Sequence, residues 1–94
     1  MNKYSKMRRA HFKVRKYFEK QGGLVFIIQH TRFQHDIFNL WDGFIILNGI
    51  VSFVQIKSNR FPTIKPYKDF CEKYDVNGLL INVPDRKEIK IKQI

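Results

Sequence analysis

Cysteine and acidic residues are scarce in this chain of 94 residues, and it contains no long apolar run. The lone Cys71 excludes an internal disulfide and all zinc motifs with several cysteines, so we expect a packing role for it and a reducing cytoplasm as the location. No stretch is apolar enough for a membrane span, and the basic N-terminus lacks the apolar part of a secretory signal. The composition therefore predicts one small domain over residues 1–94 with no membrane partner.

Lys and Arg outnumber Asp and Glu by 18 to 8, which gives a formal net charge of +10. This excess favours a polyanionic partner, most simply nucleic acid, although a lysine-rich proteome would produce the same balance. The pattern from about Ser5 to Gln21 predicts a helix that Gly22-Gly23 ends. Basic residues recur at three- and four-residue steps along it, and we expect this basic stripe to contact phosphates; a solvated face is the alternative. The basic stripe consists of Lys6, Arg9, Lys13, Lys16 and Lys20.

The other elements follow from hydrophobic periodicity and turn residues. A second helix is expected to begin after Thr63, its N-cap, and to run to about Tyr74. The expected strands are Leu24–Gln29, Gly43–Leu47, Ile50–Ile56, Leu79–Val83 and Glu88–Gln93. The first of these is a continuous apolar run and is predicted to be buried, and the last is a lysine-guarded edge. The core stripes of the two helices are expected to be Met7, Ala10, Val14, Tyr17 and Phe18, and Ile64, Tyr67, Phe70, Cys71 and Tyr74. The order helix, three strands, helix, two strands predicts an α/β domain with a mixed sheet flanked by helices.

A hairpin is the strongest local signal in the chain. Asn48-Gly49 favours a two-residue turn, which would place Leu47 opposite Ile50. The same register places Asp42 opposite Gln55 at the open end of the hairpin, and strand alternation puts Lys57 on the same face. Three polar groups at one end of an apolar hairpin indicate a candidate site, with a frayed polar fringe as the alternative.

The segment Arg32–Arg60, RFQHDIFNLWDGFII…FVQIKSNR, resembles the PD-(D/E)XK nuclease superfamily, in particular its phage and archaeal Holliday-junction-resolvase-like members. An Asp precedes an apolar strand, and a second strand ends in Gln55-x-Lys57, followed by Ser58-Asn59-Arg60. Asp36 matches the acidic residue that often precedes the motif Asp. The resemblance covers nearly the whole chain and implies the restriction-endonuclease-like minimal core, in the order α-β-β-β-α-β-β.

The resemblance also implies an activity, a metal-dependent DNA endonuclease that selects branched or duplex DNA and works as a homodimer, encoded by a phage or mobile element. Mg²⁺, or Mn²⁺ in its place, would be held by the Asp42 carboxylate, the Gln55 side-chain oxygen and the backbone carbonyl of Ile56. Lys57 would orient the attacking water or stabilise the phosphate, which makes Asp42, Gln55 and Lys57 the expected catalytic residues. Nucleic-acid contacts are expected from the basic stripe and from Arg32, Asn59 and Arg60.

The sequence departs from the family pattern at two positions. Gln55 stands where most relatives have Asp or Glu, and His11 stands where a Glu commonly helps to hold the metal. His11 and Asp36 are therefore accessory candidates; a metal ligand, a phosphate contact and a packed histidine at the core edge remain open for His11. His30, His35 and Asp36 match no zinc spacing. The alternatives for function are a DNA-binding module with a degenerate site on the same fold, and an RNA-cleaving or RNA-binding protein.

Overall fold

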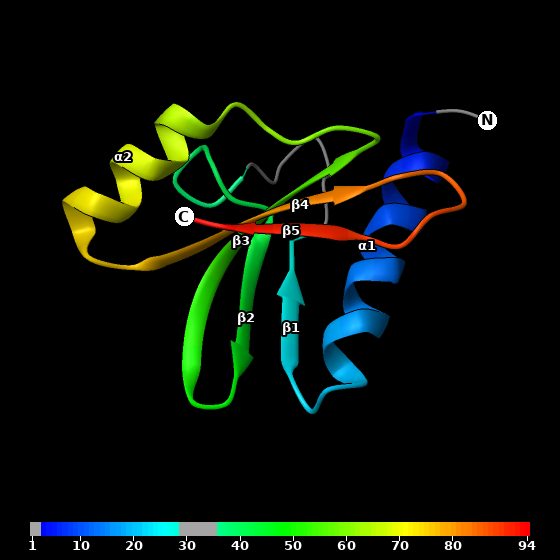
Figure 1. The fold of residues 1–94 in the computed structure, drawn as a ribbon, viewed down its shortest axis with the longest axis horizontal. Coiled ribbons are helices and arrows are strands. Elements are labelled where there is room, and N and C mark those ends of the chain that lie inside the picture. Colours follow the sequence, from blue (N-terminus) through cyan, green and yellow to red (C-terminus); the bar gives the residue numbers. More distant parts are fainter. Residues whose placement is uncertain (1–2, 29–35) are drawn as a thin grey trace.

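The computed structural model describes residues 3–28 and 36–94. They form the helices α1 (Lys3–Glu19) and α2 (Ile64–Tyr74) and the strands β1 (Leu24–Ile27), β2 (Gly43–Leu47), β3 (Ile50–Ser58), β4 (Asn77–Val83) and β5 (Lys90–Gln93). One sheet contains all five strands in the order β1-β2-β3-β4-β5 (Figure 1). β3 and β4 are parallel and the other neighbours are antiparallel, so the predicted mixed α/β sheet is confirmed.

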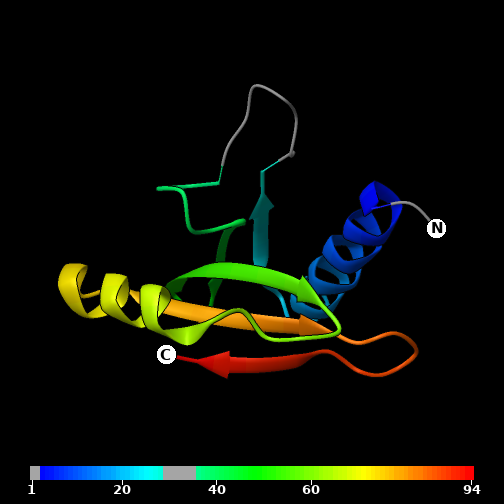
Figure 2. The same cartoon turned by 90° about the horizontal axis from the view of Figure 1, so that it is seen from above.

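The sheet separates two cores, each covered by one helix. α1 packs Ala10, Val14 and Phe18 against residues such as Val54 and Ile56 of β3. The second core lies under α2 and is built from Tyr67, Cys71 and Leu80 around the fully buried Trp41, so the packing role expected of Cys71 is confirmed. Figure 2 shows the two helices apart from each other, on either side of a strongly twisted sheet. β3 is central and covered on both faces, which explains why three consecutive residues near its end are buried.

The hairpin has the predicted register. Leu47 pairs with Ile50, and the ladder continues to Gly43 opposite Val54. Asn48 and Gly49 both have positive φ, as a two-residue turn of this kind requires. The ladder changes at Asp42, whose backbone amide donates to the carbonyl of Val54 at 2.8 Å instead of pairing with Gln55. The predicted direct pair of Asp42 with Gln55 is therefore not formed, because the pairing is distorted at Asp42, immediately before β2 begins.

Several sequence-based expectations about burial and boundaries were wrong. β1 is an edge strand that α1 covers on one face only, so Leu24, predicted to be buried, is 66% exposed. Three residues expected in the core stripes are also exposed because they lie at the margin of the helix faces: Tyr17, Ile64 and Tyr74. The strand expected at Leu79 begins at Asn77, and the one expected at Glu88 begins at Lys90. The predicted lysine-bearing edge strand is confirmed as β5.

Neither α1 nor α2 is long and apolar enough to cross a membrane.

Candidate functional site

Asp42 is held at the start of β2 by hydrogen bonds to both neighbouring segments. Its carbonyl accepts from the amide of Ile28, just after β1, at 2.9 Å, and its own amide donates to β3. Its carboxylate Oδ2 accepts a 2.8 Å hydrogen bond from the amide of Ile56, and the residue is only 4% exposed. The preceding Trp41 is wedged among the rings of α2 and β3. Asp42 is therefore a fixed carboxylate whose position the sheet determines.

Gly43 allows this arrangement because β1, its neighbour in the sheet, approaches it unusually closely where Ile27 pairs with Gly43. A Cβ at this position would lie 1.9 Å from the carbonyl oxygen of Phe26, and backbone atoms cannot give way as a flexible side chain could. Only glycine permits so close an approach of two strands. Because Gly43 directly follows Asp42, this close contact with β1 also fixes the backbone that carries the Asp42 carboxylate.

A cavity of about 490 Å³ brings the predicted catalytic residues together. We call it the Asp42 cavity. It is lined by Asp42, Gln55, Ile56 and Lys57 from the sheet, and its remaining wall comes from α1 and the loops: Lys6, Met7, Ala10, His11, Asp36, Ser58 and Arg60. His11 therefore borders the cavity, and the three roles that the sequence leaves open for it remain predictions. Asp36 reaches the same cavity because a tight turn, closed by the hydrogen bond from the Asn39 amide to the Asp36 carbonyl, returns the chain toward Asp42.

Gln55 differs from the other residues that line this cavity because its side-chain amide is buried and, among the described residues, incompletely hydrogen-bonded. It is 6% exposed, and its Oε1 has no hydrogen-bond partner within residues 3–28 and 36–94. A buried amide oxygen without a partner is unfavourable by about 1–3 kcal/mol, so a bound water that donates to this oxygen, or a cation that it coordinates, would stabilise it. Ile56 donates its amide toward β2, and the amide and carbonyl of one residue project to the same side of a strand, so its carbonyl also points to that side.

These oxygen atoms fit a hard divalent cation. Mg²⁺ prefers oxygen ligands and keeps several waters, so one carboxylate and one or two neutral oxygens form an adequate set. No group of three or more His, Cys, Asp and Glu side chains placed to hold a metal occurs in the described residues. A metal bound here would therefore depend on the neutral oxygen of Gln55, as the departure from the family pattern suggested.

A second, smaller hollow adjoins the Asp42 cavity at the start of α2. It has a volume of about 270 Å³ and shares Lys57 and Arg60 with the Asp42 cavity, and Tyr67 contributes to its wall. Burial raises the pKa of the Tyr67 phenol, and the negative charges of Asp42 and Asp36 raise it further. The sequence suggested only a core position for Tyr67. Its ring does pack in the core, 5.1 Å from the ring of Trp41, while the residue also borders this hollow.

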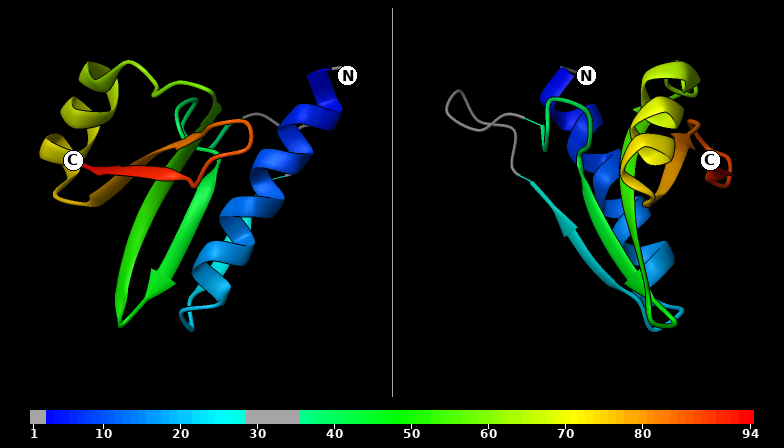
Figure 3. Two further views of the ribbon diagram at one scale, coloured as in Figure 1. Left: turned by 45° about the vertical axis from the view of Figure 1, so that its right-hand side comes forward. Right: turned by 90° about the vertical axis from the view of Figure 1, so that its left-hand side faces the viewer.

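The basic stripe leads to the Asp42 cavity along α1. Lys6 lines both that cavity and a neighbouring groove of about 760 Å³ that also contains Arg9, Lys13 and Arg86. Lys16 and Lys20 continue the stripe toward the C-terminal end of α1, beside the loop between β4 and β5. Figure 3 shows this loop close to α1 in the left-hand view.

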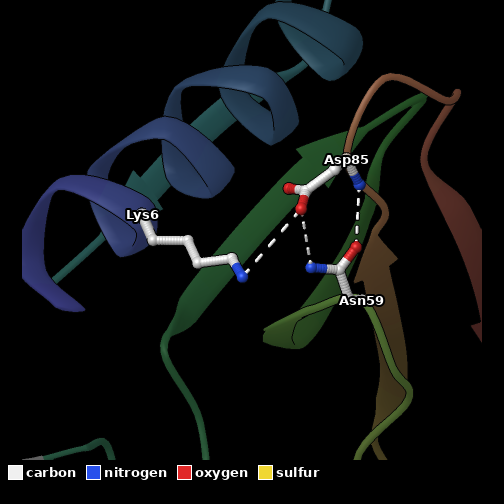
Figure 4. Close-up of polar contacts among 3 residues, drawn as sticks. All are labelled: Lys6, Asn59 and Asp85. Atoms are coloured by element: carbon white, nitrogen blue, oxygen red, sulfur yellow. Dashed lines mark hydrogen bonds and ion pairs between the residues drawn. The ribbon is translucent and has the colours of Figure 1, made fainter. Parts of the chain in front are cut away.

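Asn59, expected to contact nucleic acid, forms two hydrogen bonds with Asp85. Its side chain donates to Asp85 Oδ2 at 3.1 Å and accepts from the Asp85 amide at 2.8 Å, which ties the end of β3 to the loop after β4 (Figure 4). Lys6 reaches the same carboxylate at 4.0 Å, an exposed ion pair of little energetic weight. Of the other expected residues, Arg60 lies in the Asp42 cavity, whereas Arg32, His30 and His35 lie outside the described residues.

Comparison with known proteins supports the fold and gives no match at the sequence level. No protein-family profile matches the chain, and no curated protein matches it. Among solved structures, the chain is similar to Hjc of Archaeoglobus fulgidus, a Holliday junction resolvase from an archaeal hyperthermophile, with a TM-score of 0.67. The superposition covers 90% of this chain and 74% of that chain at 8% sequence identity. The restriction-endonuclease-like core expected from the sequence is therefore confirmed as the fold of this protein, the fold that a resolvase also has.

Proposed function

We propose that this protein is a metal-dependent DNA endonuclease that recognises branched DNA. The observation that carries the proposal is the meeting of Asp42, Gln55 and Lys57 in one cavity, on a fold that a Holliday junction resolvase shares. The sequence motif had suggested the same residues. Because fold alone does not determine function, the proposal rests on the cavity and its charges.

Each side chain has a distinct role in the proposed reaction. The Asp42 carboxylate and the Gln55 Oε1 would hold Mg²⁺, or Mn²⁺, with the Ile56 carbonyl as a further ligand. When bound, the ion supplies Lewis acidity, which makes a water molecule easier to deprotonate and offsets the negative charge of the phosphate. Lys57 would stabilise the charge that develops on the phosphate oxygens. Arg60 would hold the phosphodiester in place, and His11 and Asp36 would shape the water network at the cavity wall.

One gel assay tests the function against its alternatives. Four-way junctions, linear duplex, plasmid and RNA are incubated with the protein, with Mg²⁺ and with EDTA. We expect nicking of the junction that depends on Mg²⁺ and little cleavage of RNA. Junction binding without nicking would support the degenerate DNA-binding module, and preferential RNA cleavage would support the RNA-directed alternative.

The basic stripe is proposed to supply phosphate contacts, and their number can be measured. Each neutralised phosphate contributes roughly −0.9 to the slope of log K against log salt, so about four contacts contribute a slope of roughly −3 to −4. We therefore expect the slope, measured by fluorescence anisotropy, to flatten by this amount when Gln replaces Lys6, Arg9, Lys13 and Lys16. The matched control replaces four exposed lysines of α2 and β5, namely Lys68, Lys73, Lys90 and Lys92. If the control flattens the slope as much as the stripe variant does, the DNA does not lie along α1.

We also propose a homodimer, because a four-way junction has two-fold symmetry and its resolution needs two cuts. One sheet face suits such a contact. Leu24, Ile46 and Val51 are cross-strand neighbours on the face of β1–β3 opposite the α1 core, and two of them are exposed. A chain of net charge +10 repels its copy over most of its surface, so an uncharged apolar face is where two copies can approach.

Sedimentation velocity tests the dimer and this face together. We expect the protein to sediment as a dimer, and Leu24→Lys combined with Val51→Lys to produce a folded monomer. Ile50→Lys is the matched control, because Ile50 is as exposed as Val51 but projects to the other face of β3. If the double variant is still a dimer, the dimer contact lies on another face. If the wild-type protein binds the junction as a monomer, the homodimer is excluded.

A further inference from the structure

We propose that the hollow at the start of α2 binds the sugar-phosphate unit next to the scissile phosphate, so that Tyr67 and Thr63 position the DNA strand across Lys57. We call it the α2 hollow. The inference rests on the proposed nuclease function and adds to it the path of the strand. It arises from a feature that the motif does not explain, namely that a second hollow shares Lys57 and Arg60 with the Asp42 cavity.

The residues shared by three neighbouring spaces indicate the path of the strand. Lys6 is common to the groove along α1 and the Asp42 cavity, and Lys57 and Arg60 are common to the Asp42 cavity and the α2 hollow. The three spaces thus form a chain, with a cation at each junction between them. A nucleic-acid strand carries one negative charge per nucleotide. A row of hollows with cations between them therefore matches such a strand.

The lining of the α2 hollow matches a sugar and a phosphate. Lys57 and Arg60 supply positive charge, and the rings of Pro62 and Pro66 supply an apolar wall. Thr63 occupies the N-cap position of α2, yet its side chain makes no capping hydrogen bond, so the hydroxyl is not used by the helix. At about 270 Å³ the hollow is slightly below the ~300 Å³ at which sites for drug-sized molecules begin, which suits a single backbone unit.

Tyr67 is suited to donate a hydrogen bond to this unit. Its phenol has a raised pKa, mainly because of burial and secondarily because of Asp42 and Asp36, so it remains protonated at neutral pH. A neutral phenol can donate to a phosphate oxygen without adding negative charge beside the Asp42 carboxylate. The packed ring is 9% exposed and fixes where the hydroxyl can lie.

Thymidine 3′,5′-bisphosphate is a suitable probe because its two phosphates can occupy the Asp42 cavity and the α2 hollow together. We expect it to shift the backbone amide signals of residues 63–65, of Tyr67 and of Lys57 in two-dimensional NMR, recorded with EDTA and no divalent ion. It should bind more tightly than thymidine 3′- or 5′-monophosphate. Tyr67→Phe keeps the ring in the core but removes the hydroxyl. It should lower the affinity for the bisphosphate by about tenfold, which is the effect of losing one hydrogen bond to a charged group.

Tyr74→Phe is the matched control, since Tyr74 lies on the same helix, is 55% exposed and does not line the hollow. Arg60→Gln is a second variant that leaves the core intact, and it should also lower the affinity for the bisphosphate. Signal shifts confined to α1, or an unchanged affinity in both variants, would overturn the assignment of the α2 hollow. A different result would contradict the proposed nuclease function: the protein would cleave no DNA, while the bisphosphate would still bind at residues 63–67.

Discussion

Asp42→Asn and Lys57→Ala are each expected to reduce junction cleavage by at least about 100-fold. Removal of one group that stabilises a transition-state charge typically reduces kcat by about 10²–10³. Asp42→Asn removes the charge that would hold the cation but keeps an oxygen to accept the 2.8 Å hydrogen bond from the Ile56 amide. Single-turnover nicking of a labelled junction at saturating protein measures the loss.

The choice of substitution at Asp42 follows from its burial. Its place at the open end of the hairpin, taken from the sequence alone, predicts that Asp42→Ala leaves the fold intact. The structure instead shows a residue 4% exposed whose carboxylate satisfies a buried amide, so Asp42→Ala is expected to destabilise the protein by about 1–3 kcal/mol. Urea denaturation of Asp42→Asn and Asp42→Ala separates this structural effect from the catalytic one.

Junction binding should survive in Lys57→Ala, because the basic stripe supplies several other phosphate contacts. Lys68→Ala is the control for loss of one positive charge, since Lys68 is exposed on α2 away from the Asp42 cavity. Full turnover by Lys57→Ala, or by Asp42→Asn, would remove the nuclease assignment from these positions.

Gln55→Glu is expected to increase the affinity for Mg²⁺ by about tenfold or more and to preserve or improve cleavage. The substitution places a second carboxylate in the Asp42 cavity, where Oε1 of Gln55 is buried without a partner among the described residues. An added anionic ligand strengthens the binding of a hard cation. The gain in rate should be largest at low Mg²⁺, where the wild-type protein is unsaturated. Isothermal titration calorimetry with Mg²⁺ and nicking rates across a Mg²⁺ series provide the comparison.

The same variant should lose stability when the metal is absent. Burial and the nearby Asp42 carboxylate are expected to raise the pKa of the carboxyl introduced at position 55 above its value in the unfolded chain. The folded state then binds more protons than the unfolded state between these two pKa values, so stability falls as pH rises through that window. Thermal melts with EDTA should therefore show Gln55→Glu close to wild type near pH 4 and less stable at pH 8, and Mg²⁺ should restore it. If Mg²⁺ affinity, cleavage rate and pH dependence are all unchanged, Gln55 is not a ligand.

The sequence by itself determined the features that depend on neighbouring residues. The Asn48-Gly49 turn fixed the register of the hairpin, because a two-residue turn leaves a single way for the flanking strands to pair. That register and strand alternation were enough to place Gln55 and Lys57 in one cavity with Asp42. Helical spacing likewise aligned the basic residues on one side of α1, and the order of helices and strands predicted a mixed sheet, in which β3 and β4 are the parallel pair.

Only the tertiary structure decided the features that depend on contacts between distant segments. The exposure of β1 follows from which sheet face each helix covers, and a run of apolar residues does not contain that information. The close approach of β1 to Gly43 is a contact between segments 16 residues apart, and the missing partner of Gln55 Oε1 among the described residues depends on how the surrounding strands pack. Tyr67 reaches the α2 hollow because α2 packs on Trp41, which lies 26 residues away in sequence, so no local pattern could have indicated it. Local sequence thus fixed which residues could form the site, and packing between distant elements decided the shape of the space that they enclose.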